Sequence, residues 1–312
     1  MIGTLALLIG LSTLFFTVLL TIFGISDLLT VGVLVILFNL AQWLFAPYLI
    51  NAMYRVKEVS RSDSPKLYNI VERLSERASI KMPKVMLANI PIPNAFAYGS
   101  PIAGSRVAVT SGLLKELEAE EVEGVLGHEL GHLKHRDVQI MMFASLLPAI
   151  FYFLGNSLLI SSWYGRNQRQ EGGAVPALVG MACIALYWVL SLFVLGLSRL
   201  REYYADRHSV SIVDDGARKL SEALAKIVSS TGKFRMRQNG GSNINSFKSL
   251  FIDDPDRATT EMVQLSKYRS YLTDQRLVRE ILSKEVSLTN KIMELFSTHP
   301  NIVKRLRALQ SF

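Results

Sequence analysis

The chain has 312 residues, half of them hydrophobic, and its 34 Lys and Arg residues outnumber 26 Asp and Glu residues for a net charge of +8. The apolar share is high for a soluble globular chain, which argues against that class. The lone cysteine, Cys183, excludes both an intrachain disulfide and a thiolate metal site. Because the polar segments contain no basic run with interleaved aromatic residues, we expect no nucleic-acid partner.

Four long runs of the chain carry no charged side chain. They are residues 2–26, 28–54, 138–165 and 172–198. Each exceeds the roughly 20 apolar residues that a helix needs to cross a bilayer. The first run lacks a basic leading region and a small-residue cleavage site, so we do not expect it to be a removable signal peptide. The sequence therefore predicts a mainly α-helical integral membrane protein with four transmembrane helices.

Basic residues flanking the spans indicate the orientation, because short loops rich in Lys and Arg stay on the cytoplasmic side. Such residues follow the second and fourth spans, whereas the opposite loops are less basic. We therefore expect a multi-pass protein of the plasma (inner) membrane, with both termini and the active site cytoplasmic. The predicted segments are a transmembrane hairpin over 1–54, a polar segment over 55–137, a second hairpin over 138–198 and a polar segment over 199–312.

The first polar segment combines one helix with short strands. Apolar residues at helical spacing predict a helix over 67–74. Strands are predicted at 84–88, 94–99 and 106–110, followed by a short helix that begins at Ser111. The simplest interpretation is a small antiparallel sheet. A sharper one is that an edge strand pairs with an extended substrate peptide.

A His-Glu-x-x-His pattern at 128–132 lies within a predicted helix over 118–137, whose first turn is acidic. At about 3.6 residues per turn, His128 and His132 share one face of that helix, where both imidazoles can bind a single zinc ion. Glu129 lies beside them, where its carboxylate can reach a zinc-bound water. With no Pro or Gly in residues 133–137, we expect the helix to continue into the third span. The alternative is a charged surface helix with histidines in register by chance.

The third ligand comes from the far end of the fourth span. Because the last two spans are predicted to form an antiparallel hairpin, their cytoplasmic extensions should be neighbours. This brings Glu202 towards the histidines as the third zinc ligand. Asp206 shares its face and is expected to accept the other ring N–H of a ligand histidine. The alternative for the two acids is an ion-paired surface turn with Arg199 and Arg201.

Three stretches, 94–97, 127–137 and 198–206, together resemble the HtpX branch of membrane zinc metalloproteases, which is related to the CAAX prenyl endopeptidases. The resemblance covers nearly the whole chain. It implies a cytosolic gluzincin-type protease domain with one zinc ion per chain, acting on damaged or misfolded membrane proteins or unfolded polypeptides. The residues it implies are the ligands His128, His132 and Glu202, the catalytic Glu129, and a substrate-binding strand of Asn94, Ala95, Phe96 and Ala97.

The C-terminal segment is predicted to hold helices over 210–227, 272–282 and 302–309, with a mobile surface insert over 229–256 that is rich in Gly, Asn and Ser. His299, in Thr-His-Pro before Arg305, resembles the end of the same family. There such a histidine approaches the site and stabilises the transition state. The family often has a second proline where this chain has Asn301.

Three other functions compete with a zinc endopeptidase that acts on membrane proteins in the bilayer. A prenyl-protein processing enzyme would use the same chemistry in a large lipid-accessible chamber, for which four spans are few. A zinc transporter would need ligands within the spans, yet the spans contain no Asp, Glu or His. A catalytically inactive scaffold would be expected to have lost Glu129 or a ligand, and none is missing.

Overall fold

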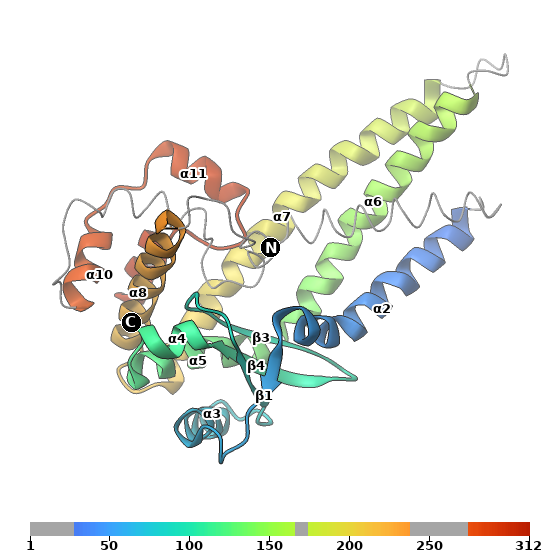
Figure 1. The fold of residues 1–312 in the computed structure, drawn as a ribbon. Helices are drawn as coiled ribbons and strands as arrows, with labels where there is room; N and C mark the ends of the chain where they lie inside the picture. Colours follow the sequence, from blue (N-terminus) through green and yellow to red (C-terminus); the bar gives the residue numbers. More distant parts are fainter. Residues whose placement is uncertain (1–27, 166–173, 238–273) are drawn as a thin grey trace. The chain divides into compact units, whose positions relative to one another are not determined.

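The computed structural model of the chain describes residues 28–165, 174–237 and 274–312 (Figure 1). The chain forms two compact units. The apolar unit comprises residues 1–43 and 139–197, and the polar unit comprises residues 44–138 and 198–312. The division of the chain into four segments stays a prediction.

Three described helices are long and apolar enough to cross a membrane: α2 (Leu28–Tyr54), α6 (Asp137–Gly165) and α7 (Ala174–Ile212). In the apolar unit α6 and α7 run side by side (Figure 1). A β-carbon built on Gly155 would lie 3.0 Å from the carbonyl oxygen of Gly180, so the missing side chains let the two helices approach closely. The predicted first span, residues 2–26, lies outside the described residues.

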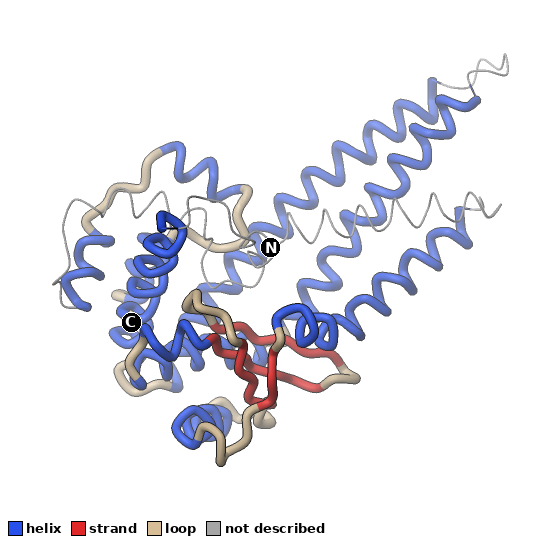
Figure 2. The backbone as a smooth tube through the Cα atoms, viewed as in Figure 1, coloured by secondary structure: helices blue, strands red, loops and turns tan. Residues whose placement is uncertain are grey.

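The polar unit contains a mixed four-stranded sheet in the order β1 (Val56–Glu58), β2 (Lys84–Ala88), β4 (Gly104–Thr110) and β3 (Ala95–Ser100) (Figure 2). β2 and β4 are parallel, and the other two pairs are antiparallel. The prediction of an antiparallel sheet was therefore wrong for the central pair, because β4 inserts between β2 and β3. β1 was not predicted, since three residues with two charges show no apolar alternation.

The two faces of the sheet bury different side chains. Val85, Val107 and Val109 face the main core of the unit. Phe96 and Tyr98 belong to a second cluster on the other side, together with the end of α2. Alternate residues of a strand point to opposite faces, so this division follows directly from the pleat. Among the described residues β3 pairs with β4 alone, which makes it an edge strand.

Helices supply the rest of the main core, to which Leu126, Leu224 and Leu306 each contribute a fully buried side chain. The predicted helix over 302–309 is confirmed, and those over 67–74 and 272–282 are confirmed with shifted ends. The described helices that lie wholly in the polar unit are α3 (Pro65–Arg77), α4 (Ser111–Glu116), α5 (Ala119–Lys134), α8 (Gly216–Arg237), α10 (Asp274–Leu282), α11 (Leu288–Leu295) and α12 (Ile302–Leu309).

Two predicted boundaries were wrong. The helix expected over 210–227 is split, because α7 ends at Ile212 and Asp215 adopts a left-handed backbone conformation (φ 55°) before α8 begins. α8 also continues to Arg237, so the first residues of the expected insert are helical. The remainder of that insert, 238–256, lies outside the described residues.

The helix carrying the His-Glu-x-x-His motif does not run into the next one as predicted. α5 ends at Lys134, Arg136 takes a left-handed conformation (φ 54°), and α6 begins at Asp137. On one continuous helix, residues five apart point about 140° away from each other. The turn instead lets Asp137 reach back to His132, a contact that one continuous helix would not allow.

Candidate active site

α5 is fixed at its N-terminus by charge. Glu118 and Glu121 form a capping box, each side chain bonding the other's backbone N–H. The buried Glu121 carboxylate also forms an ion pair with Lys226, with 2.7 Å between Nζ and Oε1. Since acidic groups are favourable at a helix N-terminus, this arrangement stabilises α5 and sets its position against α8.

Small residues bring α5 and α7 into close contact. A β-carbon on Gly127 would lie 2.8 Å from Ser209 Oγ, and one on Gly131 would lie 3.1 Å from the Cα of Ala205. Ser209 Oγ donates a hydrogen bond to the carbonyl of Gly124 at 2.7 Å. The part of α7 in the polar unit, Ser198–Ile212, therefore lies directly against the turns of α5 that carry the motif.

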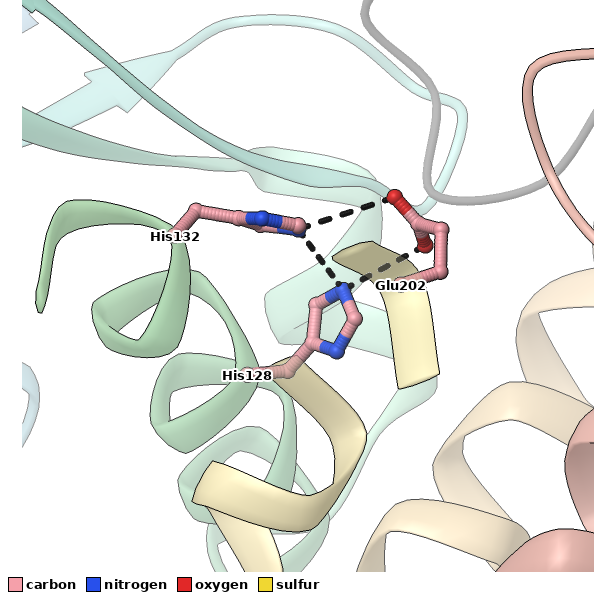
Figure 3. Close-up of side chains that lie close together, drawn as sticks. All are labelled: His128, His132 and Glu202. Carbon is pink, nitrogen blue, oxygen red and sulfur yellow. Dashed lines mark hydrogen bonds and ion pairs between the residues drawn. The ribbon is translucent and has the colours of Figure 1, made fainter. Parts of the chain in front are cut away.

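His128, His132 and Glu202 point towards one another from these two helices (Figure 3). The Nε2 atoms of the histidines are 3.1 Å apart. The Glu202 carboxylate lies 3.6 Å from Nε2 of His128 and 3.7 Å from Nε2 of His132. These three side chains, as predicted from the sequence, form a group that could hold a metal ion.

His128 is buried and its other ring nitrogen faces Asp206. Its Nδ1 lies 2.8 Å from Oδ1 of Asp206. Arg305 of α12 donates two bonds to the same carboxylate, Nε to Oδ2 at 2.9 Å and Nη2 to Oδ1 at 2.6 Å. The Asp206 carboxylate thus contacts the ring nitrogen of His128 that faces away from Glu202, while the guanidinium compensates the charge of the buried carboxylate.

His132 has a corresponding support from other residues. Its Nδ1 lies 2.6 Å from Oδ2 of Asp137, and Asp137 forms an ion pair with Arg201. The predicted alternative, in which Arg199 and Arg201 pair with Glu202 and Asp206, is not what the structure has. Arg201 binds Asp137, and Arg199 donates to backbone carbonyls at the end of α11.

The Nε2 atoms of the two histidines and the Glu202 carboxylate direct their lone pairs at the same point. Because Nδ1 of each histidine faces a carboxylate, the ring proton belongs on Nδ1 and the Nε2 of each carries a lone pair. The Glu202 carboxylate adds a negative charge to the same small space. Three acceptors at these separations repel one another, and a bound cation removes that repulsion.

Glu202 and Asp206 are both ionised despite burial. Burial alone would raise the pKa of Glu202, but His299 and Arg305 oppose it and hold that pKa well below its usual range. Burial likewise opposes ionisation of Asp206, and Arg305 and His128 outweigh it and lower the pKa. The site therefore presents carboxylates rather than carboxylic acids at neutral pH.

Glu129 is buried and lies beside the edge strand of the sheet. Its Oε2 accepts a hydrogen bond from the backbone N–H of Ala97 at 2.7 Å. The Ala97 N–H therefore points to the unpaired side of β3. The backbone of Asn94 bonds Thr110 on the paired side. Since alternate residues of a strand bond on opposite sides, the main chain of Ala95 also faces the open edge.

The side chains of the predicted substrate strand do not face the open edge. Asn94, Ala95 and Phe96 are buried, Ala95 in the main core and Phe96 in the second cluster. Any pairing with a peptide at this strand must then use main-chain groups, because the side chains stand above and below the sheet.

His299 reaches the same group of residues from the C-terminal segment. Its Nδ1 lies 3.3 Å from Oε2 of Glu202, and its side chain is 12% exposed. Arg305 approaches the same carboxylate, with Nη1 at 3.3 Å from Oε2. Two cationic or hydrogen-bonding groups therefore border the Glu202 carboxylate.

Sequence reasoning missed Asp137, Arg201 and the contacts of Arg305. A nearly fully buried arginine requires an acidic partner, but its burial is visible only in the fold. Asp137 follows His132 by five residues and becomes a partner only because the helix breaks between them. His135 and His208, for which no ligand role was predicted, pack against each other with ring centroids 5.6 Å apart.

The sequence is similar to those of known proteins. Residues 61–312 match peptidase family M48. A protease HtpX homolog of Thermoplasma acidophilum is 38% identical over 296 residues, covering 93% of this chain and 87% of that protein. One of Aeropyrum pernix is 41% identical over 272 residues, covering 86% and 82%.

A solved structure has a similar fold. The crystal structure of S. mikatae Ste24p matches with a TM-score of 0.53 at 19% identity. The match covers 98% of this chain and 64% of that one, so this chain spans less than two thirds of its length. At this identity the likeness concerns the fold alone.

Proposed function

The chain belongs to peptidase family M48, and on that premise we propose how its site hydrolyses peptide bonds. It is a membrane metalloendopeptidase. We propose that its metal is one zinc ion per chain, with His128, His132 and Glu202 as ligands.

The convergence of three lone pairs is the observation that carries this proposal. Two atoms bound to one tetrahedral zinc ion at about 2.0–2.1 Å lie about 3.3 Å apart. The separations between the three ligand atoms here are 3.1, 3.6 and 3.7 Å. Two neutral imidazoles and one carboxylate are also the donor set of catalytic zinc sites, which leave a position open. Both the spacing and the chemistry thus suit zinc.

Zinc bound here would polarise the scissile carbonyl and lower the pKa of a water molecule to about 7. Glu129 accepts the proton of the attacking water and then delivers it to the leaving amine. The hydrogen bond from Ala97 holds the Glu129 carboxylate beside β3, where the substrate backbone is expected. Glu129 is therefore positioned at both the strand edge and the motif helix.

The substrate is expected to add an extended strand to the open edge of β3. The main-chain groups of Ala95 and the carbonyl of Ala97 would pair with it, while the Ala97 N–H stays bonded to Glu129, and the buried side chains of Asn94 and Phe96 would hold the strand in place. Main-chain pairing selects for an unfolded segment rather than for a sequence. This suits misfolded or damaged membrane proteins as substrates.

His299 is proposed to stabilise the negative charge that develops on the substrate carbonyl. Its Nδ1 contacts Glu202, which keeps the ring at the edge of the ligand group. A donor already held in place at that position costs no reorganisation during the reaction. Arg305 is assigned a positioning role, because it contacts Asp206 and Glu202.

The cellular arrangement follows from the basic residues around the spans. We propose that the polar unit and both termini are cytoplasmic in the inner membrane. Membrane-protein substrates would then be cut where their disordered segments emerge from the bilayer. The prenyl-protein alternative shares the chemistry, and cleavage of a prenylated peptide against an unmodified membrane protein distinguishes the two.

The substitution Glu129→Gln tests the assignment of the base. It keeps the shape of the side chain but removes its basicity, so turnover should fall by about 100- to 10,000-fold. Zinc content should stay at the parent level, because Glu129 is not a ligand. The measurement is cleavage of an unfolded membrane protein, with and without chelator, beside metal analysis of both proteins. Cleavage by the variant at the parent rate would rule out Glu129 as the base.

A further inference from the structure

Helix α11 exposes a continuous apolar face that the mechanism does not use. Leu288, Ile292 and Leu295 recur at spacings of four and three residues, and Phe296 follows at the helix end. Leu288 is 77% exposed and Phe296 63% exposed, and the two between them are exposed by more than half. At about 100° per residue these four side chains lie on one side of the helix. An exposed apolar face of this kind marks an interaction surface.

The opposite side of α11 is anchored to the polar unit. Glu294 is buried, and its carboxylate forms an ion pair with Lys304 and accepts a hydrogen bond from the backbone N–H of Asn301. The guanidinium of Arg199 donates to the carbonyls of Glu294 and Ser297, each at 2.8 Å. The apolar face is thus turned outward by polar contacts behind it.

The contact with Arg199 also indicates how close α11 lies to the membrane surface. It is the first charged residue after the charge-free run 172–198, on the same continuous helix α7. Arginines at the end of a span occupy the boundary between hydrocarbon and water. The neighbouring Leu200 and Tyr204, on one face of α7, are 57% and 61% exposed, as expected for residues at that boundary.

The charge of α11 suits the same surface. With Glu294 buried and paired, Lys291 is the charged side chain that the helix exposes. A short helix with an apolar face and a basic flank is typical of peptides that lie in an interface rich in anionic lipid.

We propose that α11 lies flat on the membrane surface, with Leu288, Ile292, Leu295 and Phe296 inserted into the lipid interface. The bilayer then holds the segment that leads into the site, because His299 follows Phe296 by three residues. The contact extends the membrane attachment of α7 onto the polar unit. It goes beyond the proposed function and can be tested without any measurement of activity.

The test is a depth measurement on the full-length protein in phosphatidylcholine–phosphatidylglycerol vesicles. Cys183→Ala removes the native thiol, and a nitroxide label is placed at Ile292→Cys or Phe296→Cys. Two matched exposed positions serve as references, Lys115→Cys on α4 for water and Phe193→Cys in the apolar part of α7 for lipid. Collision rates with oxygen, which concentrates in lipid, and with a water-soluble nickel chelate are compared.

The proposal predicts an oxygen-to-nickel ratio at Ile292 and Phe296 several times that at Lys115 and close to that at Phe193. A ratio equal to that at Lys115 would mean that the face is in water and would overturn the proposal. Low rates with both reagents would mean that protein covers the face, either a second copy or another segment of the chain, and would also overturn it. Repeating the measurement at high lipid dilution separates those last two cases.

Discussion

His128 and His132 share one face of α5, yet the regions that support them differ. The inner support, Asp206 and Arg305, is almost wholly buried, and Arg305 also contacts Glu202. The outer support, Asp137 and Arg201, holds a histidine whose side chain is 19% exposed, against 2% for His128. One support is built by the C-terminal helix and the other by the turn that follows α5.

The difference indicates that the two supports contribute unequally to the stability of the fold and to metal binding. The inner support ties the ligand group to the core of the polar unit, because α12 contributes Leu306 to that core and Arg305 to the site. The outer support joins the turn after α5 to α7, and the side chains of Arg201 and Asp137 are 9% and 10% exposed, against 1% and 3% for Arg305 and Asp206. Damage to the inner support should therefore reduce both stability and metal binding, and damage to the outer support should reduce stability less.

The largest effect is expected from Asp206→Asn. The substitution removes the charge of the carboxylate that accepts two hydrogen bonds from the buried Arg305, and breaking a buried ion pair costs about 3–5 kcal/mol. We expect a large drop in thermal stability in detergent, together with loss of bound metal. The paired substitution Asp206→Asn with Arg305→Met should recover part of the stability but not the metal, since it removes the guanidinium that has lost the Asp206 charge, while Glu202 loses its contact with Arg305. If Asp206→Asn alone were as stable as the parent protein, the role given to the inner support would be wrong.

Asp137→Asn tests the outer support and should have a smaller effect. Loss of a carboxylate behind a metal-binding histidine weakens metal affinity by about 10- to 100-fold. Competition with a chelator of known affinity measures this change, and thermal unfolding should shift less than in Asp206→Asn. If Asp137→Asn destabilised the protein more, the assignment of the two supports would have to be exchanged.

The third prediction concerns the close approach of α5 and α7, on which both supports depend. Gly127→Ala places a methyl group 2.8 Å from Ser209 Oγ and Val213 Cγ2 and should cost about 1–3 kcal/mol by overpacking. Gly32→Ala is the control in a helix, because a β-carbon there meets no atom of another described segment within 4 Å. Thermal unfolding of both variants is the measurement. Equal stability of the two variants would mean that α5 and α7 do not need this close approach.

How much of this site the sequence predicts depends on the range of each interaction. His128, Glu129 and His132 follow from helical periodicity, which is local. Glu202 and Asp206 follow from one topological step, the antiparallel return of the last span. The substrate strand was predicted as an edge, and β3 is one, but the order of the sheet was not, because β2 and β4 are distant in sequence and pair through a crossover.

The supports behind the ligands were harder to predict. Arg305 is about a hundred residues from Asp206, and nothing local marks it as buried. Asp137 needs a left-handed residue at Arg136, which no glycine or proline signals. Such contacts become visible only when the chain has been folded, because tertiary packing stabilises them rather than local preference.

The metal content of the parent protein and of Glu202→Ala, with X-ray absorption spectra of the zinc, tests the central proposal most directly. The account predicts one zinc per chain in the parent, with two imidazole nitrogens and a carboxylate among its ligands, and a large loss of zinc in the variant. Full zinc occupancy in Glu202→Ala, with an unchanged spectrum, would contradict the proposal that α5 and α7 together bind the ion.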